Sequence, residues 1–192
     1  MAVVKLNPKP KNAIVFAGSS IFHLWTTLAD DMAPLPVINQ AFAGARIQSV
    51  FNAMDKLIVP YNPKIIVYYC GSNDINDGAE SSDLLSGFKK FVSAVRDKLP
   101  STIVYFVSIN KAPQKMEKWN VIDDSNEKIK KWCKKTDGLY FIDINPPFFS
   151  GGKSRTDLFF EDGLHFQLEA YRKFTKIIKP VIEEGWKAVN SE

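Results

Sequence analysis

Residues 64–74 read KIIVYYCGSND, an apolar run that ends at a glycine and continues into polar residues. A strand that is apolar at every position, rather than at alternate positions, is typical of a parallel sheet covered on both faces. Similar short runs occur at residues 13–18, 36–41, 101–110 and 139–144. The pattern therefore predicts a buried parallel sheet of five strands.

Segments with helical periodicity separate these runs and follow the last one. They lie at about 21–32, 45–58, 82–98, 119–135 and 167–188. The last segment carries one apolar stripe, made of Leu168, Tyr171, Phe174, Ile178, Val181 and Trp186. Pro180 predicts a kink within it. The alternation predicts a three-layer, doubly wound α/β sandwich of the flavodoxin-like kind, with right-handed crossovers. No repeat or linker divides the chain, so we expect one domain over residues 1–192.

Composition narrows the class of protein. With 45% hydrophobic and 24% charged residues, the chain of 192 residues is typical of a soluble globular protein. The net charge of +4 is spread along the sequence, which argues against a nucleic-acid partner or a stable membrane association. Cys70 and Cys133 are too few and too far apart for a disulfide framework or a zinc site, so we expect two buried apolar side chains.

The N-terminal sequence bears on location. Its longest apolar run is about five residues, too short for a signal-peptide core. No stretch approaches the roughly 18 apolar residues of a membrane span. We therefore expect a cytoplasmic protein.

Polar residues follow four of the five predicted strands. Open α/β sheets bind ligands at the carboxyl ends of their strands, so these residues are candidates for a site at one edge. In chain order they are Ser19 and Ser20; Asn39, Gly44 and Arg46; Asn73 and Asp74; and Asp162 and His165, which close the long loop after the fifth strand.

This set of groups matches the needs of acyl transfer: a nucleophile, a base, a group that orients the base, and donors for the oxyanion. Ser20, at the start of a predicted helix, has a free backbone N–H beside its hydroxyl. Gly44 can present its N–H without a side chain in the way, and Asn73 offers an amide. Asp162 can bond one imidazole nitrogen of His165, which leaves the other to accept the serine proton.

In order and wording, the four motifs resemble the signature of the SGNH hydrolases, also called the GDSL esterase and lipase family. FAGSSI (16–21) and NQAFAG (39–44) are similar to the first two motifs, GSND (71–74) is the third, and DGLH (162–165) matches the last. The resemblance extends from about residue 13 to 182. It implies Ser20 as nucleophile, Asp162 and His165 as its partners, and an oxyanion hole of Ser20, Gly44 and Asn73. Ser19 departs from the family, which usually has Asp there, as does Ala170, where many members have Gly.

Each of these residues also has a purely structural interpretation. Gly followed by two serines is often only a helix cap, which we expect to be the role of Ser19. GSND and Gly44 would fit ordinary turns. His23 lies one helical turn beyond Ser20 and is a second candidate base, although it has no acid nearby before Asp30.

Two further segments have open or structural interpretations. The basic helix at 127–135 has an apolar face that includes Ile129 and Trp132, so we expect its lysines to form a solvated surface. Trp25, Phe159 and Phe160 flank the predicted site and fit either an acyl pocket or the core.

We therefore expect a serine esterase that acts on small esters with short acyl groups, acetyl above all, and acetylated carbohydrate as a natural substrate. The same acyl-enzyme would serve an acyltransferase, a thioesterase or a lysophospholipase. No metal or organic cofactor is expected. An alternative of another class is a non-catalytic α/β module that binds flavin or phosphate, but the first loop lacks a glycine-rich phosphate cradle.

Overall fold

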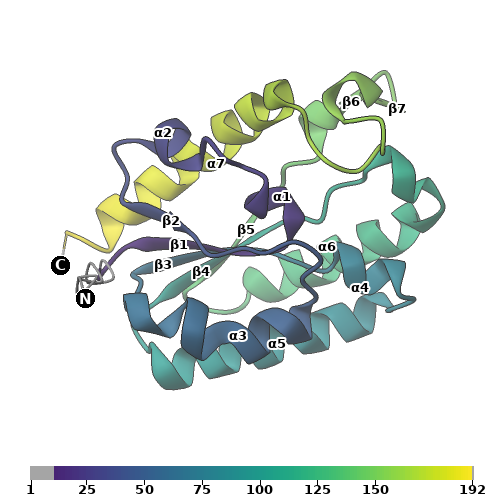
Figure 1. Ribbon diagram of the computed structural model, residues 1–192. Helices are drawn as coiled ribbons and strands as arrows, with labels where there is room; N and C mark the ends of the chain where they lie inside the picture. The colour runs from purple at the N-terminus through teal and green to yellow at the C-terminus, as the bar shows by residue number, and fades with distance from the viewer. Residues whose placement is uncertain (1–10, 192) are drawn as a thin grey trace, which may run out of the picture.

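The computed structural model describes residues 11–191 (Figure 1). The elements of the main α/β layers are β1 (Ile14–Gly18), α1 (Ser20–His23), α2 (Leu28–Met32), β2 (Val37–Asn39), α3 (Ile47–Leu57), β3 (Ile65–Tyr69), α4 (Ser72–Asn76), α5 (Ser81–Lys98), β4 (Ile103–Val107), α6 (Trp119–Cys133), β5 (Leu139–Ile142) and α7 (Leu168–Ala188). Smaller elements are the 3₁₀ turns η1 (Val59–Tyr61), η2 (Pro113–Lys118), η3 (Pro146–Phe148) and η4 (Thr156–Leu158), and the short strands β6 (Phe149–Ser150) and β7 (Lys153–Ser154). Residues 1–10, on which the expectation of no signal peptide partly rests, and residue 192 lie outside the described part.

The predicted parallel sheet is confirmed. Its five strands run in the order β2-β1-β3-β4-β5. β1 pairs with β3 in register from Ile14 opposite Ile65 to Gly18 opposite Tyr69. The two strands therefore end side by side, and the residues that follow them emerge at the same edge of the sheet.

Helices cover both faces of the sheet, which explains why the central strands β1, β3 and β4 are apolar at every position. α1, α2 and α7 lie on one face, and α3, α5 and α6 lie on the other (Figure 1). Along β1, Phe16 packs into the core on the α7 side, whereas Val15 and Ala17 pack into the core on the α5 side. Cys70 and Cys133 are buried free thiols, as expected.

The helix expected over 21–32 is wrong as a single element, because it divides into α1 and α2. The chain turns at residues 24–27 so that Trp25, only 1% exposed, enters the core. The Trp25 ring N–H and the Thr27 hydroxyl both donate to the Asp31 carboxylate at 2.6 Å. Burial of one large side chain thus overrides the helical periodicity of the segment.

The apolar stripe predicted for α7 is only partly correct. Tyr171, Phe174 and Ile178 are buried, but Leu168 and Val181 are 55% and 36% exposed. The buried face continues through Ile182 instead, one position along the chain from Val181. The helix runs through Pro180 as one element.

The long loop after β5 contains more structure than its sequence indicates. β6 and β7 form an antiparallel hairpin, and Phe159 forms an isolated bridge with Phe166. Two-residue strands are too short to produce a pattern in the sequence. Among the helices of residues 11–191, none combines the length and the hydropathy that crossing a membrane requires.

Candidate active site

Three of the predicted site residues form a hydrogen-bonded chain, although Ser20 and His165 are 145 positions apart. The Ser20 hydroxyl lies 3.0 Å from Nε2 of His165. Nδ1 of the same ring lies 2.6 Å from Oδ2 of Asp162. With Nδ1 bonded to a carboxylate, the ring carries its proton on that side and leaves Nε2 free to accept the serine proton.

The sharp exit from β1 places Ser20. Gly18 has a φ of +141°, and a Cβ there would lie 1.8 Å from the Tyr69 carbonyl oxygen. Ser19 is 1% exposed, and its N–H donates to the same carbonyl at 3.0 Å. α1 then begins at Ser20, whose own N–H has no acceptor among the described residues. That N–H is free to bind an oxygen of a substrate.

A tight turn positions Asp162 under the imidazole. Oδ1 of Asp162 accepts the backbone N–H groups of Leu164 and His165 at 2.9 and 3.0 Å, while Oδ2 meets the ring. Desolvation acts to raise the pKa of this carboxyl, but the N–H groups of His165 and Leu164 and the imidazole together hold the pKa below its ordinary value. Asp162 is therefore ionised at neutral pH and can stabilise a protonated imidazole.

Gly44 and Asn73, the two other predicted oxyanion donors, lie in contacting segments. The Asn73 amide donates to the Ala45 carbonyl at 3.0 Å, which uses one of its two N–H bonds and leaves the second available. Gly44 has a φ of +72°, and its N–H has no acceptor within residues 11–191. Both groups therefore retain a free donor.

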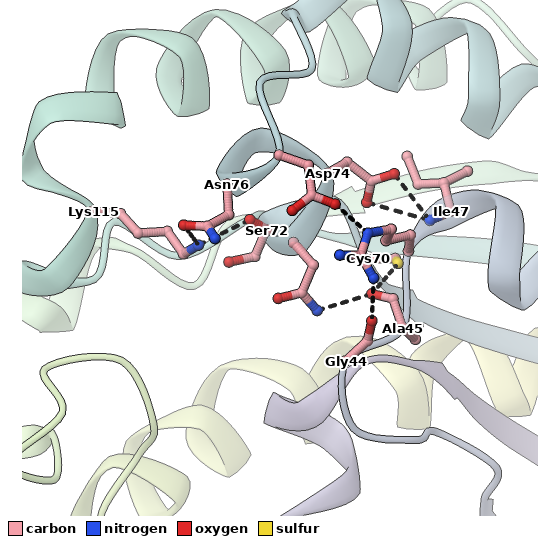
Figure 2. Close-up of polar contacts among 11 residues, drawn as sticks. Gly44, Ala45, Ile47, Cys70, Ser72, Asp74, Asn76 and Lys115 are labelled. Carbon is pink, nitrogen blue, oxygen red and sulfur yellow. Dashed lines mark hydrogen bonds and ion pairs between the residues drawn. The ribbon is translucent and has the colours of Figure 1, made fainter.

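Further contacts hold the segment of residues 44–47 against α4 (Figure 2). The Asp74 carboxylate accepts the Ile47 N–H at 3.2 and 3.3 Å, at the start of α3. Burial raises the pKa of Asp74, and the Ile47 N–H partly offsets this. Arg46 forms an ion pair with Asp77 just beyond α4. These contacts hold the donors on the two segments at a constant separation.

The remaining candidates fall into structural roles. The His23 imidazole donates through Nδ1 to the Ala41 carbonyl at 3.2 Å and makes no side-chain hydrogen bond to Ser20. Ser19 occupies the N-cap position of α1, but its side chain makes no capping hydrogen bond. Trp25 and Phe159 are core residues at 1% and 3% exposure, whereas Phe160 is 55% exposed. Of these three aromatic residues, only Phe160 is therefore available to contact a ligand.

Sequence reasoning missed residues that hold the site from a distance. The Tyr171 hydroxyl of α7 donates to the Ile21 carbonyl at 2.8 Å, beside Ser20. Asn39, which the sequence marks only as a polar strand-end residue, donates through its amide to the Phe22 carbonyl at 2.6 Å. The Lys115 ammonium donates to the Ser72 carbonyl at 3.0 Å. A lysine with a buried ammonium looks like any other lysine in the sequence, so no local pattern indicates it.

The site is open to solvent. The side chain of His165 is 26% exposed and that of Asp162 is 45% exposed. The predicted triad residues and oxyanion donors lie outside four cavities of about 460, 280, 730 and 240 Å³ on the protein. Within residues 11–191, no cluster of three or more His, Cys, Asp or Glu side chains is arranged to hold a metal ion.

Comparisons with known proteins agree with this fold. A candidate acylhydrolase from Bacteroides fragilis superposes with a TM-score of 0.80 at 20% identity, over 92% of this chain and 90% of that one. A GDSL-like lipase from Bacteroides thetaiotaomicron gives 0.77 at 19%, over 90% and 88%. A carbohydrate esterase of family 3 from Talaromyces cellulolyticus gives 0.69 at 14%, over 94% and 99%.

A search of the curated proteins found no match. The family model for the GDSL-like lipase/acylhydrolase family matches residues 16–173, which include all four motifs. The solved structures share the fold of this chain at low identity, and its five-stranded parallel sheet with flanking helices is the fold of the SGNH hydrolases. This chain therefore belongs to the GDSL-like lipase/acylhydrolase family.

Proposed function

We propose that this protein is a serine esterase that hydrolyses esters of short acyl groups through an acyl-serine intermediate. The observation that carries the proposal is the chain of hydrogen bonds from Ser20 through His165 to Asp162, at 3.0 and 2.6 Å. A hydroxyl, an imidazole and a carboxylate in this order are the parts of a serine nucleophile with its base and orienting acid.

In the proposed reaction, the Ser20 hydroxyl attacks the ester carbonyl and its proton passes to Nε2 of His165. The oxyanion is bound by the N–H groups of Ser20 and Gly44 and by the free N–H of Asn73. His165 then returns the proton to the departing alcohol, and the acyl group stays on Ser20. A water molecule activated by His165 attacks the acyl-serine and releases the acid. Asp162 holds the ring orientation throughout.

The openness of the site supports a short acyl group and a bulky alcohol. The side chains of His165 and Asp162 are 26% and 45% exposed, so a large alcohol such as a carbohydrate can extend into solvent while its acetyl group reaches Ser20. The carbohydrate esterase from Talaromyces cellulolyticus shares the fold, which makes acetylated carbohydrate a reasonable class to test first.

The proposal is tested with purified protein and p-nitrophenyl esters from acetyl to palmitoyl. We expect the highest kcat/KM with acetyl and a steady fall with chain length. Ser20→Ala is expected to lose more than about 10³-fold in kcat, because the nucleophile is removed while the fold is kept. A fluorophosphonate probe is expected to label the wild-type chain at Ser20 and to leave Ser20→Ala unlabelled.

His23→Ala is the matched control. His23 is the other of the two histidines in the chain, and its imidazole is hydrogen-bonded to the Ala41 carbonyl and not to Ser20. It is expected to keep wild-type activity. Full activity of Ser20→Ala would refute the proposed nucleophile, and inactivity of His23→Ala would reassign the base. A preference for palmitoyl esters would contradict the short-chain proposal and leave the nucleophile in place.

Hydrolysis and transfer share the same acyl-enzyme and differ only in the acceptor. The His165 side chain is 26% exposed, so the site admits either water or another alcohol as the acceptor. Adding a sugar alcohol to the p-nitrophenyl acetate assay separates the two, since an acyltransferase forms the acetylated sugar in preference to acetate.

A further inference from the structure

Lys115 has an unusual environment for a lysine. It lies in η2 on the connection from β4 to α6, and it is only 4% exposed, which is rare for this residue type. Burial lowers the pKa of its ammonium, while the nearby Asp77 acts in the opposite direction. The group has no part in the proposed reaction, and within residues 11–191 no carboxylate lies within 4.0 Å of it. Because burying a charge costs free energy and no carboxylate among the described residues pairs with this one, the buried ammonium must be stabilised by other contacts.

The ammonium contacts both ends of α4, the short helix that carries Asn73 (Figure 2). It donates to the Ser72 carbonyl at 3.0 Å and lies 3.5 Å from Oδ1 of Asn76. The opposite side of α4 faces the segment of residues 44–47, to which Asn73 donates through Ala45. α4 is therefore held between Lys115 on one side and the Gly44 segment on the other.

The backbone beside Lys115 contacts the loop of the acid and the base. The Gln114 N–H donates to the Gly163 carbonyl at 3.0 Å, between Asp162 and His165 in the chain. A side chain at Gly163 would also crowd Gln114, because a Cβ there would lie 3.3 Å from the Gln114 nitrogen. Two consecutive residues therefore bridge the two parts of the site. Gln114 contacts the loop that carries Asp162 and His165, and Lys115 contacts α4, which carries Asn73.

We propose that Lys115 is a positioning residue that fixes Asn73 relative to the Ser20–His165 pair, and that it acts on catalysis only through Asn73. This inference rests on the proposed esterase function. A charge-assisted hydrogen bond to the Ser72 carbonyl fixes α4 one residue before the oxyanion donor. Because a donor contributes only when it is aimed at the developing oxyanion, a small displacement of α4 lowers kcat with little effect on substrate affinity.

The test is a double-mutant cycle on p-nitrophenyl acetate. Lys115→Met keeps the length and apolar stem of the side chain but removes the charged donor. We expect kcat to fall by about 10-fold to 100-fold with KM nearly unchanged. Asn73→Ala is expected to lower kcat by about 10²-fold to 10³-fold. In the Asn73→Ala background, Lys115→Met should cost less than about 2-fold, since the group through which it acts is gone.

The exposed Lys118 of the same segment supplies the matched control. Lys118→Met removes one positive charge without removing a contact to α4 and should leave kcat and KM unchanged. Lys115→Gln retains a neutral donor, so its kcat should lie between that of Lys115→Met and that of the wild type. Circular dichroism and thermal unfolding of each variant verify that the fold is kept.

Each outcome of the double-mutant cycle either supports or overturns the proposed role of Lys115. Retained kcat in Lys115→Met, or an equal loss with and without Asn73, overturns it and leaves the esterase proposal standing. Unfolding of both Lys115→Met and Lys115→Gln also overturns it, because Lys115 would then serve the fold as a whole. If the wild-type protein neither hydrolyses esters nor reacts with the fluorophosphonate, the esterase proposal fails first and this inference fails with it.

Discussion

At the scale of single residues, the positive-φ glycines Gly18 and Gly44 next to the site differ in what they require. Gly18 needs the absence of a side chain, because a Cβ would lie 1.8 Å from the Tyr69 carbonyl oxygen. Gly44 would have nothing within 4 Å of a Cβ and needs only its backbone conformation, with a φ of +72°. The first glycine allows β1 to end against β3, and the second adopts a left-handed conformation in which its N–H has no acceptor among residues 11–191.

This difference predicts unequal effects on stability. Gly18→Ala is expected to destabilise the protein by about 3 kcal/mol or more, at the upper end of the usual range for point mutations. Gly44→Ala should cost about 1–2 kcal/mol, because a residue with a Cβ is strained in a left-handed conformation. Urea unfolding followed by circular dichroism measures both. Equal losses would contradict the steric account of Gly18.

At the scale of elements, α7 packs so closely against Tyr105 of β4 that a side chain at its one glycine, Gly185, would overlap the tyrosine. A Cβ at Gly185 would lie 2.1 Å from the Tyr105 hydroxyl and 3.0 Å from the ring carbon that bears it. Tyr105 in turn stacks on Tyr140 of β5, with 4.8 Å between ring centroids, so a shift of the Tyr105 ring would disturb this contact. Helix propensity and packing therefore oppose each other at this position.

We expect packing to outweigh propensity. Alanine forms helices better than glycine by about 1 kcal/mol, yet Gly185→Ala should destabilise the protein by about 1–3 kcal/mol, as overpacked sites do. Tyr105→Phe in the same chain should recover part of the loss, because it removes the closest atom. The free energies of unfolding of both single variants and the double variant decide this. A Gly185→Ala protein more stable than wild type would show that the helix shifts freely.

The burial and length of each element explain whether it could be predicted from the sequence. The sheet was predictable because its central strands β1, β3 and β4 are covered on both faces and are therefore apolar throughout. The break between α1 and α2 was not, because it depends on where Trp25 is buried and on its contact with Asp31, which is a property of the core. The β6–β7 hairpin was missed because its strands are two residues each.

At the scale of the whole molecule, stability depends on pH through carboxylates whose pKa changes on folding. The pKa of Asp162 is lowered in the folded state, against a value of about 3.9 in an unfolded chain. The folded state therefore binds this proton less readily than the unfolded state. The stabilising contribution of Asp162 is fully present above the unfolded value and is lost as the pH falls through the lower folded value.

Asp162→Asn removes this titration while keeping the shape of the side chain. The difference in unfolding free energy between wild type and Asp162→Asn should therefore shrink as the pH falls below about 4. Other carboxylates with lowered pKa values titrate in both proteins and cancel in the difference; they are Asp77, Asp124 and Asp157. Urea unfolding at a series of pH values measures the difference, and one that grows toward low pH would contradict the sign of the shift.

Local patterns in the sequence are enough to place particular chemical groups after the strands. Apolar runs mark the strands, and parallel strands end at one edge, so the order of residues alone makes Ser20, Asn73 and His165 candidates for a common site. This works because strand burial and strand-end position are local properties that follow from the periodicity of the chain.

Which of these groups meet depends on how distant segments of the chain pack together. The sequence contains adjacent serines and two histidines, and the structure brings Ser20 to His165 and ties His23 to the Ala41 carbonyl instead. It also brings Lys115 to the helix that carries Asn73. Such pairings depend on the direction of side chains across distant segments, which the packing of the helices on the sheet sets and no local pattern encodes.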